Sequence, residues 1–471
     1  MFTCDQSGKI RGNAVDKKVI VIGGGPAGYA AAIKAAQLGA GVILAEKHKI
    51  GGTCLNYGCV PAKTLLRTAE FFKNAVSNAV PGVIADNVSL DWSAAQKHKE
   101  QVINQLSNGV AALLKRSGVT VCNEKALLPA PSQVRIGNET LHADAVILAS
   151  GSVNSPLSLP GNSVKSERVI DSSAALAMER IPESVIIIGG GVIGVEFAVM
   201  LMRLGVKTAV IEQAPQLLPS ADEEVAAYLK MTLESEGAAV YTGAKVIQAV
   251  QNKSSVTVTV KSDKGTVAIE AGAMLTAVGR SPNTAGLGLE ETGIQLVRGA
   301  FVTDDYFQTN VHGVYAVGDC NGKAMLAHAA IAQGEAAAEH IMGVAAHINN
   351  KLVPACIFSS PEIAYVGRTE QQLRADGIKY NVGRFDLAGN ARSIIESTGG
   401  FVKVLADSKF GEVLGVHIAG PHASEMIAEA AVCMNMEGTV EDIVNTIHAH
   451  PTVSEATREA AMSVFGRPIH G

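Results

Sequence analysis

The sequence predicts an α/β protein with two nucleotide-binding units, followed by a smaller α+β domain. Three observations lead to this fold class. A glycine-rich strand–turn–helix pattern occurs twice, both copies share one spacing, and the pattern of strands changes from about Val353 onward. The chain has 471 residues, 47% of them apolar and 18% charged. That length and composition suit two to four globular domains.

Charge and composition exclude several classes of protein. The net charge of −5 and the lack of a Lys/Arg-rich run argue against nucleic acid as a partner. No stretch approaches the roughly 18 uncharged apolar residues of a membrane span. Seven cysteines are too few for a disulfide scaffold, and an odd number cannot pair completely. The N-terminal stretch has no apolar core and carries acids that a transit peptide avoids. We therefore expect a cytoplasmic protein with no membrane partner.

The repeated pattern runs from Val19 to Glu46 and again from Val185 to Glu212, and the copies align without a gap. Each begins with a β-branched run that ends in G-G-G-x-x-G. An Ala- and Leu-rich helix follows, and a second apolar strand ends in glutamate. The last motif glycine and the glutamate are 18 residues apart in both copies (28 to 46 and 194 to 212).

Each motif glycine has a geometric role in this pattern. The first permits a tight turn, the second lets the backbone approach a pyrophosphate, and the third allows helix and strand to pack closely. These glycines are Gly23, Gly25 and Gly28 in the first unit and Gly189, Gly191 and Gly194 in the second. A single G-x-G-x-x-G is weak, because glycine turns also serve packing. Two complete units predict two Rossmann-like dinucleotide sites, which suggests electron transfer between them.

The two glutamates also predict which nucleotides bind. Glu46 and Glu212 can each accept hydrogen bonds from a ribose 2′-hydroxyl. The Glu212 carboxylate would repel the 2′-phosphate of NADP, and the next residues, Gln213 to Pro215, include no arginine to hold one. The second unit is therefore predicted to bind NAD.

The remaining pattern gives a coarse map of elements. The α/β part extends from about residue 17 to 345, with helices near 62–78, 93–117 and 222–236. Alternating residues from Val256 to Glu270 predict a hairpin inserted in the second unit. Further on, 401–407 and 412–420 read as antiparallel strands, followed by helices near 422–437, 439–447 and 454–465. Those last helices could also form an interface.

Cys54 and Cys59 lie in the stretch GGTCLNYGCVPAK, and their spacing limits what they can do. One C-x4-C supplies too few ligands for a metal site, and the plant-type iron–sulfur spacing would need a cysteine at Ala62. A reducing compartment disfavours a structural disulfide. Pro61 predicts a helix that starts near Cys59, where the helix dipole and Lys63 favour a thiolate. These residues favour a redox pair over an inert one.

This cysteine stretch resembles the redox-disulfide motif of the flavin-dependent pyridine nucleotide–disulfide oxidoreductases (class I). AVGRSPNT (277–284), VYAVGDC (314–320) and MLAHAAIAQG (325–334) also match that family, and the resemblance extends from Val19 to Gly466. FSSPEIAYVGRTE, LGVHIAGPHASEMIAEAA and HAHPTVSE are most similar to its dihydrolipoyl dehydrogenase branch. The resemblance implies a homodimer with an FAD-binding domain (1–152, with a return segment at 277–350), an NAD-binding domain (153–276) and an interface domain (351–471).

The resemblance also implies roles for single residues. Cys59 would be the thiol beside the flavin and Cys54 the one that exchanges with substrate. Lys63 would pair with Glu196 near the flavin N5. The implied FAD-binding residues are Gly23, Gly25, Gly28, Glu46, Lys63, Gly151, Asp319 and Ala327. The implied NAD-binding residues are Gly189, Gly191, Gly194, Glu212 and Gly279, and no metal site is expected. Plainer readings stay open: Glu196 could favour a helix N-terminus, Asp319 could cap a helix, and Lys63 could be a solvated helix residue.

Near the C-terminal end, His450 and Glu455 form a candidate acid–base pair. Thiol–disulfide exchange needs a thiolate, so oxidising a dithiol near neutral pH calls for a base. The residues alone also fit a capping box from Thr452 to Glu455, or make His448 and His450 two loop residues or a weak metal pair. The family resemblance favours catalysis, with the pair acting on the disulfide of the other subunit.

The reaction implied is oxidation of protein-bound dihydrolipoamide to lipoamide, with NAD⁺ reduced to NADH. The partner would be a lipoyl-bearing protein, either the E2 component of a 2-oxoacid dehydrogenase complex or the H protein of the glycine cleavage system. Alternatives are a glutathione-like reductase, which Glu212 opposes, and a mercuric reductase, whose terminal cysteine pair is replaced here by VFGRPIHG. A docking subunit is a further alternative. Tyr57 and Ala62 depart from the family motif without touching its chemistry, and Cys320 is expected to be an inert buried thiol.

Overall fold

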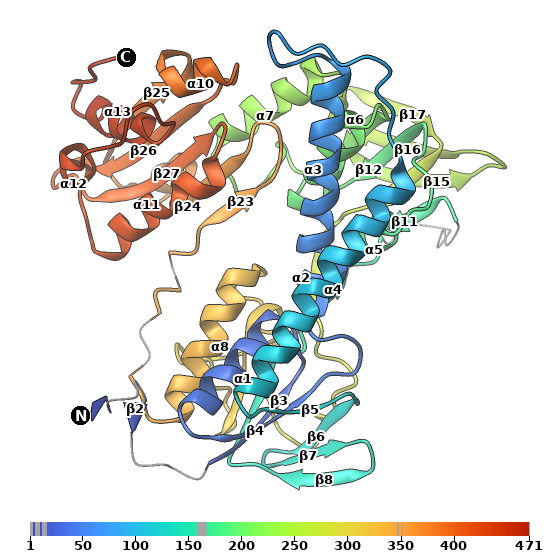
Figure 1. Cartoon of the computed structure of the whole chain (residues 1–471), viewed down its shortest axis with the longest axis vertical. Helices are drawn as coiled ribbons and strands as arrows, with labels where there is room; N and C mark the ends of the chain where they lie inside the picture. The colour runs from blue at the N-terminus through green and yellow to red at the C-terminus, as the bar shows by residue number, and fades with distance from the viewer. Residues whose placement is uncertain are drawn as a thin grey trace. The chain divides into compact units, whose positions relative to one another are not determined.

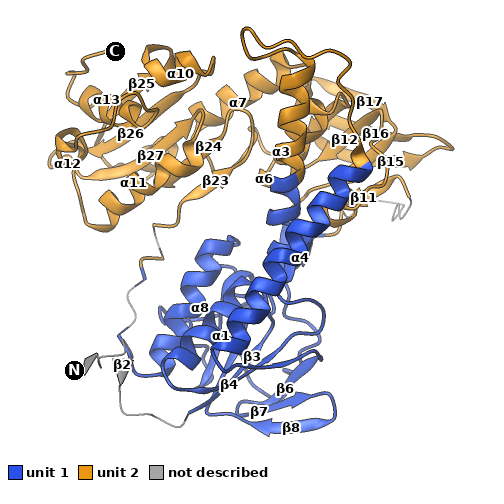
Figure 2. Cartoon of the chain, in the orientation of Figure 1, with its two compact units in different colours: residues 1–64, 93–155, 280–348 blue, residues 65–92, 156–279, 349–471 orange. Residues whose placement is uncertain are grey.

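The structure is a computed structural model that describes residues 3–4, 10–11, 17–157, 167–345, 348–350 and 352–470. Figure 1 follows its helices and strands along the chain. The chain divides into two compact units (Figure 2). Unit 1 comprises Met1–Thr64, Ser93–Ser155 and Arg280–Ile348, and unit 2 comprises Leu65–Trp92, Pro156–Gly279 and Asn349–Gly471.

Unit 1 is built on a parallel five-stranded sheet that contains the first glycine motif. Its strand order is β22 (Val314–Ala316), β9 (Ala145–Leu148), β3 (Lys18–Ile22), β4 (Gly41–Ala45) and β5 (Thr120–Cys122). Helices α1 (Pro26–Gln37) and α8 (Ala327–Ile341) pack together so closely that a Cβ on Gly334 would lie 2.3 Å from the Ala27 oxygen. Strands β6 (Ala126–Ala130), β7 (Gln133–Ile136) and β8 (Glu139–His142) add an antiparallel sheet that was not predicted.

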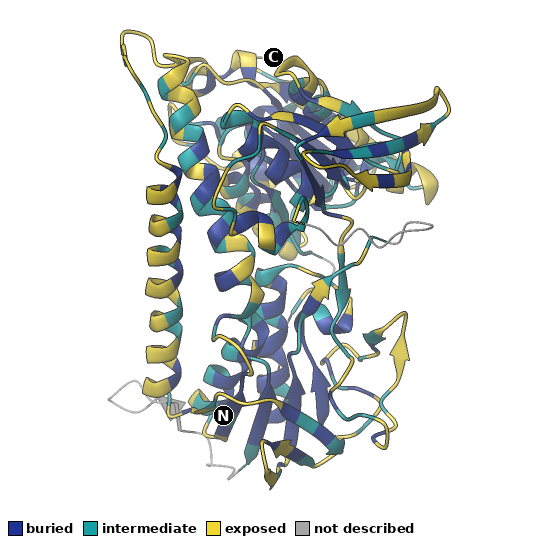
Figure 3. Ribbon diagram, turned by 90° about the vertical axis from the view of Figure 1, so that its right-hand side faces the viewer, coloured by how far each residue is buried: buried dark blue, intermediate teal, exposed yellow. Residues whose placement is uncertain are grey.

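Unit 2 contains a second parallel sheet, which repeats the strand order of unit 1 except that its first edge strand comes before the glycine motif in the chain and not after it. Its order is β11 (Val169–Asp171), β18 (Ala273–Thr276), β12 (Ser184–Ile188), β13 (Lys207–Ile211) and β14 (Ala239–Tyr241). The strand that precedes the glycine motif is third in both orders, and the strand that ends before the glutamate is fourth. These central strands are buried along most of their length (Figure 3). The predicted repeat is therefore confirmed at the level of strand order.

The predicted helices and hairpin of the α/β part are also present. They are α3 (Cys59–Val76), α4 (Trp92–Arg116) and α7 (Glu223–Ser235), together with the hairpin of β16 (Val256–Ser262) and β17 (Gly265–Ala271). A third strand, β15 (Lys245–Gln251), pairs with β16 and was not predicted. Among the described residues, no helix is both long and apolar enough to cross a membrane.

The C-terminal part of unit 2 is an antiparallel sheet with helices. The strand order is β23 (Ala355–Ile357), β24 (Ile363–Gly367), β27 (Val413–Ala419), β26 (Phe401–Asp407) and β25 (Tyr380–Asp386). The predicted strands are β26 and β27, and the predicted helices are α11 (Ala423–Asn435), α12 (Val440–Asn445) and α13 (Glu455–Ser463). The alternation of apolar runs and helical periodicity therefore predicted this α+β domain correctly.

The remaining elements are short strands, short helices and turns, together with the longer helix α6. They are β1 (Thr3–Cys4), β2 (Ile10–Arg11), β10 (Ser152–Asn154), β19 (Arg280–Pro282), β20 (Leu296–Val297), β21 (Ala300–Phe301), α2 (Gly52–Tyr57), α5 (Ser172–Leu176), α6 (Val192–Arg203), α9 (Glu370–Ala375), α10 (Ala391–Ile395) and the 3-10 turns η1 (Gly318–Asn321) and η2 (Leu387–Gly389). Of these, α6 is the helix that follows the second glycine motif.

Candidate active site

The residues predicted for FAD gather at one edge of the unit 1 sheet. Gly23 directly follows β3, Glu46 follows β4, Gly151 comes shortly after β9, and Asp319 lies in η1, just after β22. Because these strands are parallel, their carboxyl ends meet at the same edge, where ligands of open α/β sheets bind. Ala327 is the first residue of α8 in the same unit.

The motif glycines of unit 1 fall into two kinds. A Cβ on Gly23 would lie 2.2 Å from the Ala149 oxygen, and one on Gly28 would lie 1.8 Å from the Gly23 oxygen. These two glycines are required by packing. A Cβ on Gly25 would meet nothing closer than the Gly52 Cα at 3.8 Å, so protein packing does not explain that glycine. Open space beside the N-terminus of α1 fits the approach of a pyrophosphate.

The second unit repeats this division. Gly189 has a φ of +108° and a Cβ there would lie 2.3 Å from the Ala277 oxygen, while one on Gly194 would lie 1.9 Å from the Gly189 oxygen. A Cβ on Gly191 would meet no atom within 4 Å. Gly191 also caps α6 with nearly the same backbone angles as Gly25 at α1, φ −75° and ψ −174° against φ −73° and ψ −174°. Both turns therefore fit a bound dinucleotide.

The two predicted ribose acceptors have matching hydrogen bonds. Glu46 accepts from the Gly24 and His48 amides, both at 2.7 Å, and Glu212 accepts from the Gly190 and Ala214 amides, both at 2.6 Å. Each carboxylate thus fixes the glycine turn of its own unit. A carboxylate has about four acceptor positions, so each glutamate can still accept bonds from a ribose.

Asp319 is held by residues that sequence reasoning did not assign. The Ser152 hydroxyl donates to the Asp319 carboxylate at 2.5 Å, and Arg280 Nε donates to the same hydroxyl at 2.7 Å. The Asn283 amide donates to the Gly151 oxygen at 2.9 Å. Leu326, not Asp319, occupies the N-cap position of α8, so the capping interpretation of Asp319 is wrong. Arg280 and Asn283 belong to the AVGRSPNT stretch, which was the available signal.

Cys54 and Cys59 lie on consecutive helices, Cys54 within α2 and Cys59 as the first residue of α3. A hydrogen bond joins the two side chains, which is the dithiol form of the pair. That bond is the main cause that raises the pKa of Cys54, with burial and the negative charge of Cys59 adding to it. Lys63 acts in the opposite direction and Asp319 in the same one.

Tyr29 of α1 also lies near this pair. Burial raises the pKa of its hydroxyl, and the charge of Cys54 raises it further. Tyr29 carries no sequence signal of its own, because it lies among the alanines of the helix that follows the glycine turn. Unit 1 thus brings Tyr29, Cys54, Cys59, Lys63 and Asp319 into electrostatic contact.

Glu196 does not lie at the N-terminus of its helix, where the plainer interpretation placed it. It is buried in the second turn of α6, and no acidic residue lies in the first turn of that helix. Its carboxylate accepts from the Phe358 amide at 3.1 Å. The interpretation of Glu196 as a residue of the helix N-terminus is therefore wrong. Lys63 belongs to unit 1 and Glu196 to unit 2, so the Lys63–Glu196 pair stays a prediction. Gly279, predicted for NAD, follows β18 with a φ of +106°.

His450 and Glu455 form the predicted pair. His450 Nδ1 lies 2.9 Å from a Glu455 oxygen, and the imidazole is 71% exposed. The other Glu455 oxygen accepts from the Thr452 amide at 2.9 Å. Burial raises the pKa of Glu455, but the Thr452 amide and His450 together bring it below its usual value. The N-cap of α13 is Ser454, with no side-chain cap hydrogen bond, so the capping-box interpretation is wrong. Glu455 instead fixes the turn at Thr452 and orients His450 at once.

His448 is not equivalent to His450. Its Nε2 lies 2.8 Å from Glu429 and its Nδ1 3.0 Å from the Thr446 oxygen, so both nitrogens are engaged. The bond to Glu429 raises the pKa of His448, with burial opposing it. Within the described part of the chain, no three His, Cys, Asp or Glu side chains gather as a metal site would require. Cys320 is fully buried, and burial raises its pKa to about 11.

Two family patterns cover most of the chain. The pattern described as pyridine nucleotide-disulphide oxidoreductase matches residues 17–334, and the dimerisation domain of the same family matches residues 353–461. Dihydrolipoyl dehydrogenase of Bacillus subtilis (strain 168) is 39% identical over 474 residues, which cover 97% of this chain and 100% of that protein. The mitochondrial dihydrolipoyl dehydrogenase of Pisum sativum is 37% identical and covers 97% of this chain and 93% of its own.

A solved structure agrees with these matches. LpdA from Mycobacterium tuberculosis superposes with a TM-score of 0.86 at 30% identity, covering 94% of this chain and 99% of its own. The predicted fold class, two dinucleotide-binding domains and a dimerisation domain, is confirmed. The cofactors of such an enzyme are FAD and NAD, as predicted. The chain is an enzyme of the pyridine nucleotide-disulphide oxidoreductase family.

Proposed function

We propose that this enzyme oxidises dihydrolipoamide, carried on a partner protein, to lipoamide and reduces NAD⁺ to NADH. The observation that carries the proposal is the hydrogen-bonded Cys54–Cys59 pair, placed in the unit that also holds the predicted FAD edge. The full-length similarity to proteins named dihydrolipoyl dehydrogenase supports the substrate. The overall balance is dihydrolipoamide + NAD⁺ → lipoamide + NADH + H⁺.

The cysteines take the dithiol's electrons in two exchange steps. Starting from the oxidised pair, one substrate thiolate attacks Cys54 Sγ, the Cys54–Cys59 bond breaks, and Cys59 leaves as a thiolate. The second substrate thiol then attacks the substrate sulfur that is bonded to Cys54 in the mixed disulfide. This step closes the disulfide of lipoamide, releases lipoamide and leaves Cys54 reduced. In the reduced pair, the hydrogen bond to Cys59 and burial raise the pKa of Cys54, which favours its protonated form. When bound, FAD would supply the electron-transfer chemistry that connects the cysteine pair with NAD⁺.

His450 is proposed as the base that takes the proton of the attacking thiol. Glu455 engages Nδ1, which leaves Nε2 for the substrate proton. Lys63 favours the Cys59 thiolate by its charge, and the proposed Lys63–Glu196 pair would orient that charge. The glycine turns and Glu46 and Glu212 would hold the two nucleotides, with Asp319 on the FAD side.

A homodimer completes the proposal, with His450 acting on the cysteine pair of the other subunit. The matched dimerisation domain supports this arrangement. Large apolar side chains of that domain that are more than half exposed include Ile394, Ile395, Val432, Met436 and Ile447. Ile447 is 96% exposed and precedes His450 by three residues. A second copy of the chain would cover such side chains, because soluble proteins rarely leave contiguous apolar surface open.

The proposal keeps the division into 1–152, 153–276, 277–350 and 351–471 as FAD, NAD, returning FAD and interface segments. A cytoplasmic location and a lipoyl-bearing protein of a 2-oxoacid dehydrogenase complex or the glycine cleavage system go with it. The odd and small number of cysteines supports the reducing compartment.

Substrate pairs distinguish this function from its rivals. Anaerobic assays of the holoenzyme would compare dihydrolipoamide with NAD⁺ against glutathione disulfide with NADPH. We expect turnover with the first pair and background with the second. Turnover of glutathione disulfide alone would make the enzyme a reductase of the glutathione type, and no turnover of either pair would favour the docking role.

A further inference from the structure

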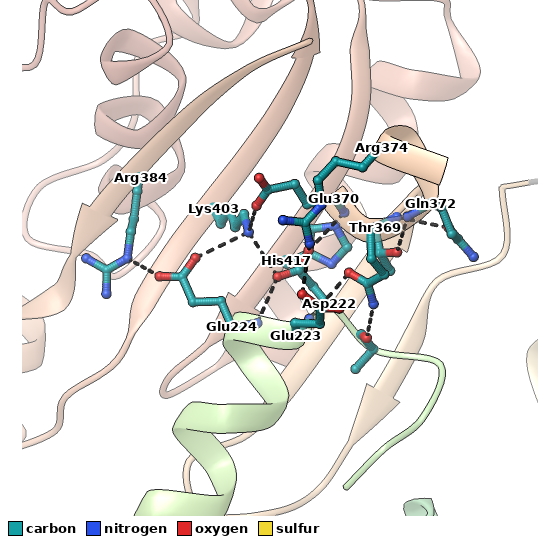
Figure 4. A network of polar contacts seen from close by, with 12 residues as sticks. Asp222, Glu223, Glu224, Thr369, Glu370, Gln372, Arg374, Arg384, Lys403 and His417 are labelled. Atoms are coloured by element: carbon teal, nitrogen blue, oxygen red, sulfur yellow. Dashed lines mark hydrogen bonds and ion pairs between the residues drawn. The ribbon is translucent and has the colours of Figure 1, made fainter. Parts of the chain in front are cut away.

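A buried lysine links the dimerisation domain to the NAD-binding part of unit 2. Lys403, on β26, is 2% exposed in its side chain and lies 3.0 Å from Asp222, 3.2 Å from Glu224 and 2.5 Å from Glu370. We call these four residues the Lys403 cluster (Figure 4). Asp222 is the N-cap of α7, and Glu370 is the first residue of α9. The cluster therefore joins α7 and α9 to β26 through the Lys403 side chain.

Further hydrogen bonds fix each carboxylate of the cluster. The two Asp222 oxygens accept from the Glu224 amide at 3.1 Å and the Glu370 amide at 3.0 Å. Glu370 also accepts from the Tyr380 hydroxyl at 2.9 Å, and Glu224 accepts from Arg384 at 2.7 Å. An ammonium ion in such surroundings keeps its charge only while its partners stay in place. Such a network is a poor source of net stability but a good determinant of geometry.

The cluster lies at the end of the loop 213–221. The loop begins directly after Glu212 and contacts the glycine turn 189–194 through Leu218. The Leu218 amide donates to the Gly190 oxygen at 2.8 Å, while Glu212 binds the amides of Gly190 and Ala214 at 2.6 Å. At the far end, Gln371 of α9 donates to the Ala221 oxygen at 2.8 Å, next to Asp222. The loop therefore connects Glu212 to the dimerisation domain through a few direct contacts.

The loop also contains a strained residue. Leu218 has a φ of +46° and is buried, a conformation that a leucine holds only when its surroundings impose it. In unit 1 the matching contact, from the Gly51 amide to the Gly24 oxygen at 2.8 Å, follows a short connection (47–50) that leads directly into α2. The longer loop of unit 2 leads into α7 instead. Its Ala221 oxygen accepts from Gln371 at 2.8 Å and from Gln216 of the loop itself at 3.1 Å. Lys403 holds the adjacent Asp222.

We propose that Lys403 and Gln371 are positioning residues for NAD: they fix Asp222 and Ala221, and the loop 213–221 then places Glu212 and the Gly190 amide for the adenosine end of the nucleotide. The inference rests on the proposed assignment of Glu212 and the turn 189–194 to NAD. It predicts that substitutions inside the dimerisation domain weaken nucleotide binding although they touch no nucleotide.

The test measures the dissociation constant of NAD⁺ by calorimetry on FAD-loaded protein, beside the KM for dihydrolipoamide. We expect Lys403→Met to weaken NAD⁺ binding about fivefold or more, as site-to-site coupling typically does. Gln371→Ala should weaken it about three- to fivefold, the usual net contribution of one hydrogen bond. The dihydrolipoamide KM and the FAD content should stay within about twofold of the parent, because a local effect on one site leaves the other unchanged.

The matched control is Arg374→Met, which breaks the exposed Arg374–Glu223 pair between the same two elements, α9 and α7. It should leave NAD⁺ binding unchanged, because exposed pairs contribute little. Unchanged NAD⁺ binding in a folded Lys403→Met protein would overturn the inference, as would equal losses for both substrates. If Lys403→Met fails to fold, Gln371→Ala decides alone.

A further variant, Glu212→Ala, separates the inference from the assignment beneath it. If Glu212→Ala weakens NAD⁺ binding and the Lys403 and Gln371 variants do not, only the positioning role is wrong. If Glu212→Ala has no effect, the assignment fails and the inference with it. Calorimetry with NAD⁺ needs no dithiol substrate. The measured effect of each variant on NAD⁺ binding would therefore stay valid even if dihydrolipoamide were not the substrate.

Discussion

At the scale of single residues, two glutamates of α13 each pair with a histidine outside the helix in the same geometry. His450 Nδ1 lies 2.9 Å from Glu455, and His470 Nδ1 lies 3.0 Å from Glu459; the two imidazoles are 71% and 67% exposed. Geometry alone therefore does not make His450 a base. The family motif around His450 is what separates the two, and this can be tested directly.

His450→Gln should lower the rate of dihydrolipoamide oxidation by roughly 10²–10⁴-fold, the usual contribution of a general base. His470→Gln, the matched control, should leave the rate within about twofold, because that pair has no role in proton transfer. Dihydrolipoamide-dependent NADH formation measures both. Equal rates for the two variants would remove His450 from the reaction.

Cys54→Ser should lower dihydrolipoamide oxidation on the order of 10³-fold or more, because serine cannot form the mixed disulfide. Cys433→Ser, which changes a half-buried thiol of α11, is the control and should retain activity. NADH formation under anaerobic conditions measures the loss. Surviving oxidation in the Cys54 variant would mean that the substrate bypasses the pair.

At the scale of elements, the glycine turn of unit 2 makes opposite predictions for two of its positions, Gly189 and Gly191. Gly191→Ala should fold with a melting temperature within about 3 °C of the parent, because its Cβ enters open space, and should weaken NAD⁺ binding about tenfold or more. Gly189→Ala should fail to fold stably, because its Cβ meets the Ala277 oxygen at 2.3 Å. Thermal unfolding and calorimetry distinguish these effects. Normal NAD⁺ binding by Gly191→Ala would show that no phosphate approaches that turn.

Element prediction succeeded where a pattern is long or repeated. The two motif units, the long helices and the strands β26 and β27 follow from periodicity and glycine spacing. The sheet β6–β8 was missed because its strands are four or five residues long and lack a clear alternation. Lys403 lies in a strand that was predicted, but its burial was not, since its carboxylate partners are 33 and 181 residues away in the sequence.

The residues of the candidate site divide in the same way, into those that carry a local motif and those that do not. The glycines, Glu46, Glu212, the cysteines and His450 carry local motifs, so the sequence could nominate them. Ser152, Arg280 and Tyr29 reach Asp319 or Cys54 only through the fold. The AVGRSPNT stretch marked Arg280 as part of a family motif, but its contact with the distant Ser152 could not be read from the sequence.

At the scale of the whole molecule, the Lys403 cluster should make stability depend on pH. Burial raises the pKa of Asp222 and Glu370, but the groups around each, Lys403 among them, bring both below their usual values. Carboxyls with a lowered folded pKa bind fewer protons than in the unfolded chain. They stabilise the fold above their unfolded pKa of about 4, and this is lost as the pH falls through the folded pKa.

Lys403→Met removes a cation that helps to lower both pKa values. We expect the variant to melt roughly 5–10 °C below the parent at pH 7, and the gap to narrow as the pH falls below about 4. Melting temperatures from about pH 7 down to about pH 3 measure this, with Arg374→Met as a control that stays near the parent throughout. A constant gap at all pH values would show that the lost packing of Lys403, and not its charge, matters.

The proposed dimer gives a second prediction at this scale. Ile447→Arg should yield monomers that retain FAD but lose dihydrolipoamide oxidation, because a charge replaces an apolar contact beside His450. Size-exclusion chromatography with light scattering gives the mass, and flavin absorbance gives the FAD content. An active monomer would contradict the assignment of His450 to the cysteine pair of the other subunit.

The central claim is that Cys54 and Cys59 carry electrons between a dithiol and the flavin. Differential alkylation tests it most directly: the holoenzyme is kept in air, or treated anaerobically with dihydrolipoamide or with NADH, then alkylated in denaturant and analysed by peptide mass spectrometry. The account predicts that both cysteines are protected in air and that both become alkylated after either reductant, dihydrolipoamide acting from the substrate side and NADH through the flavin. Cysteines that are alkylated already in air, or that stay protected after NADH, would contradict it.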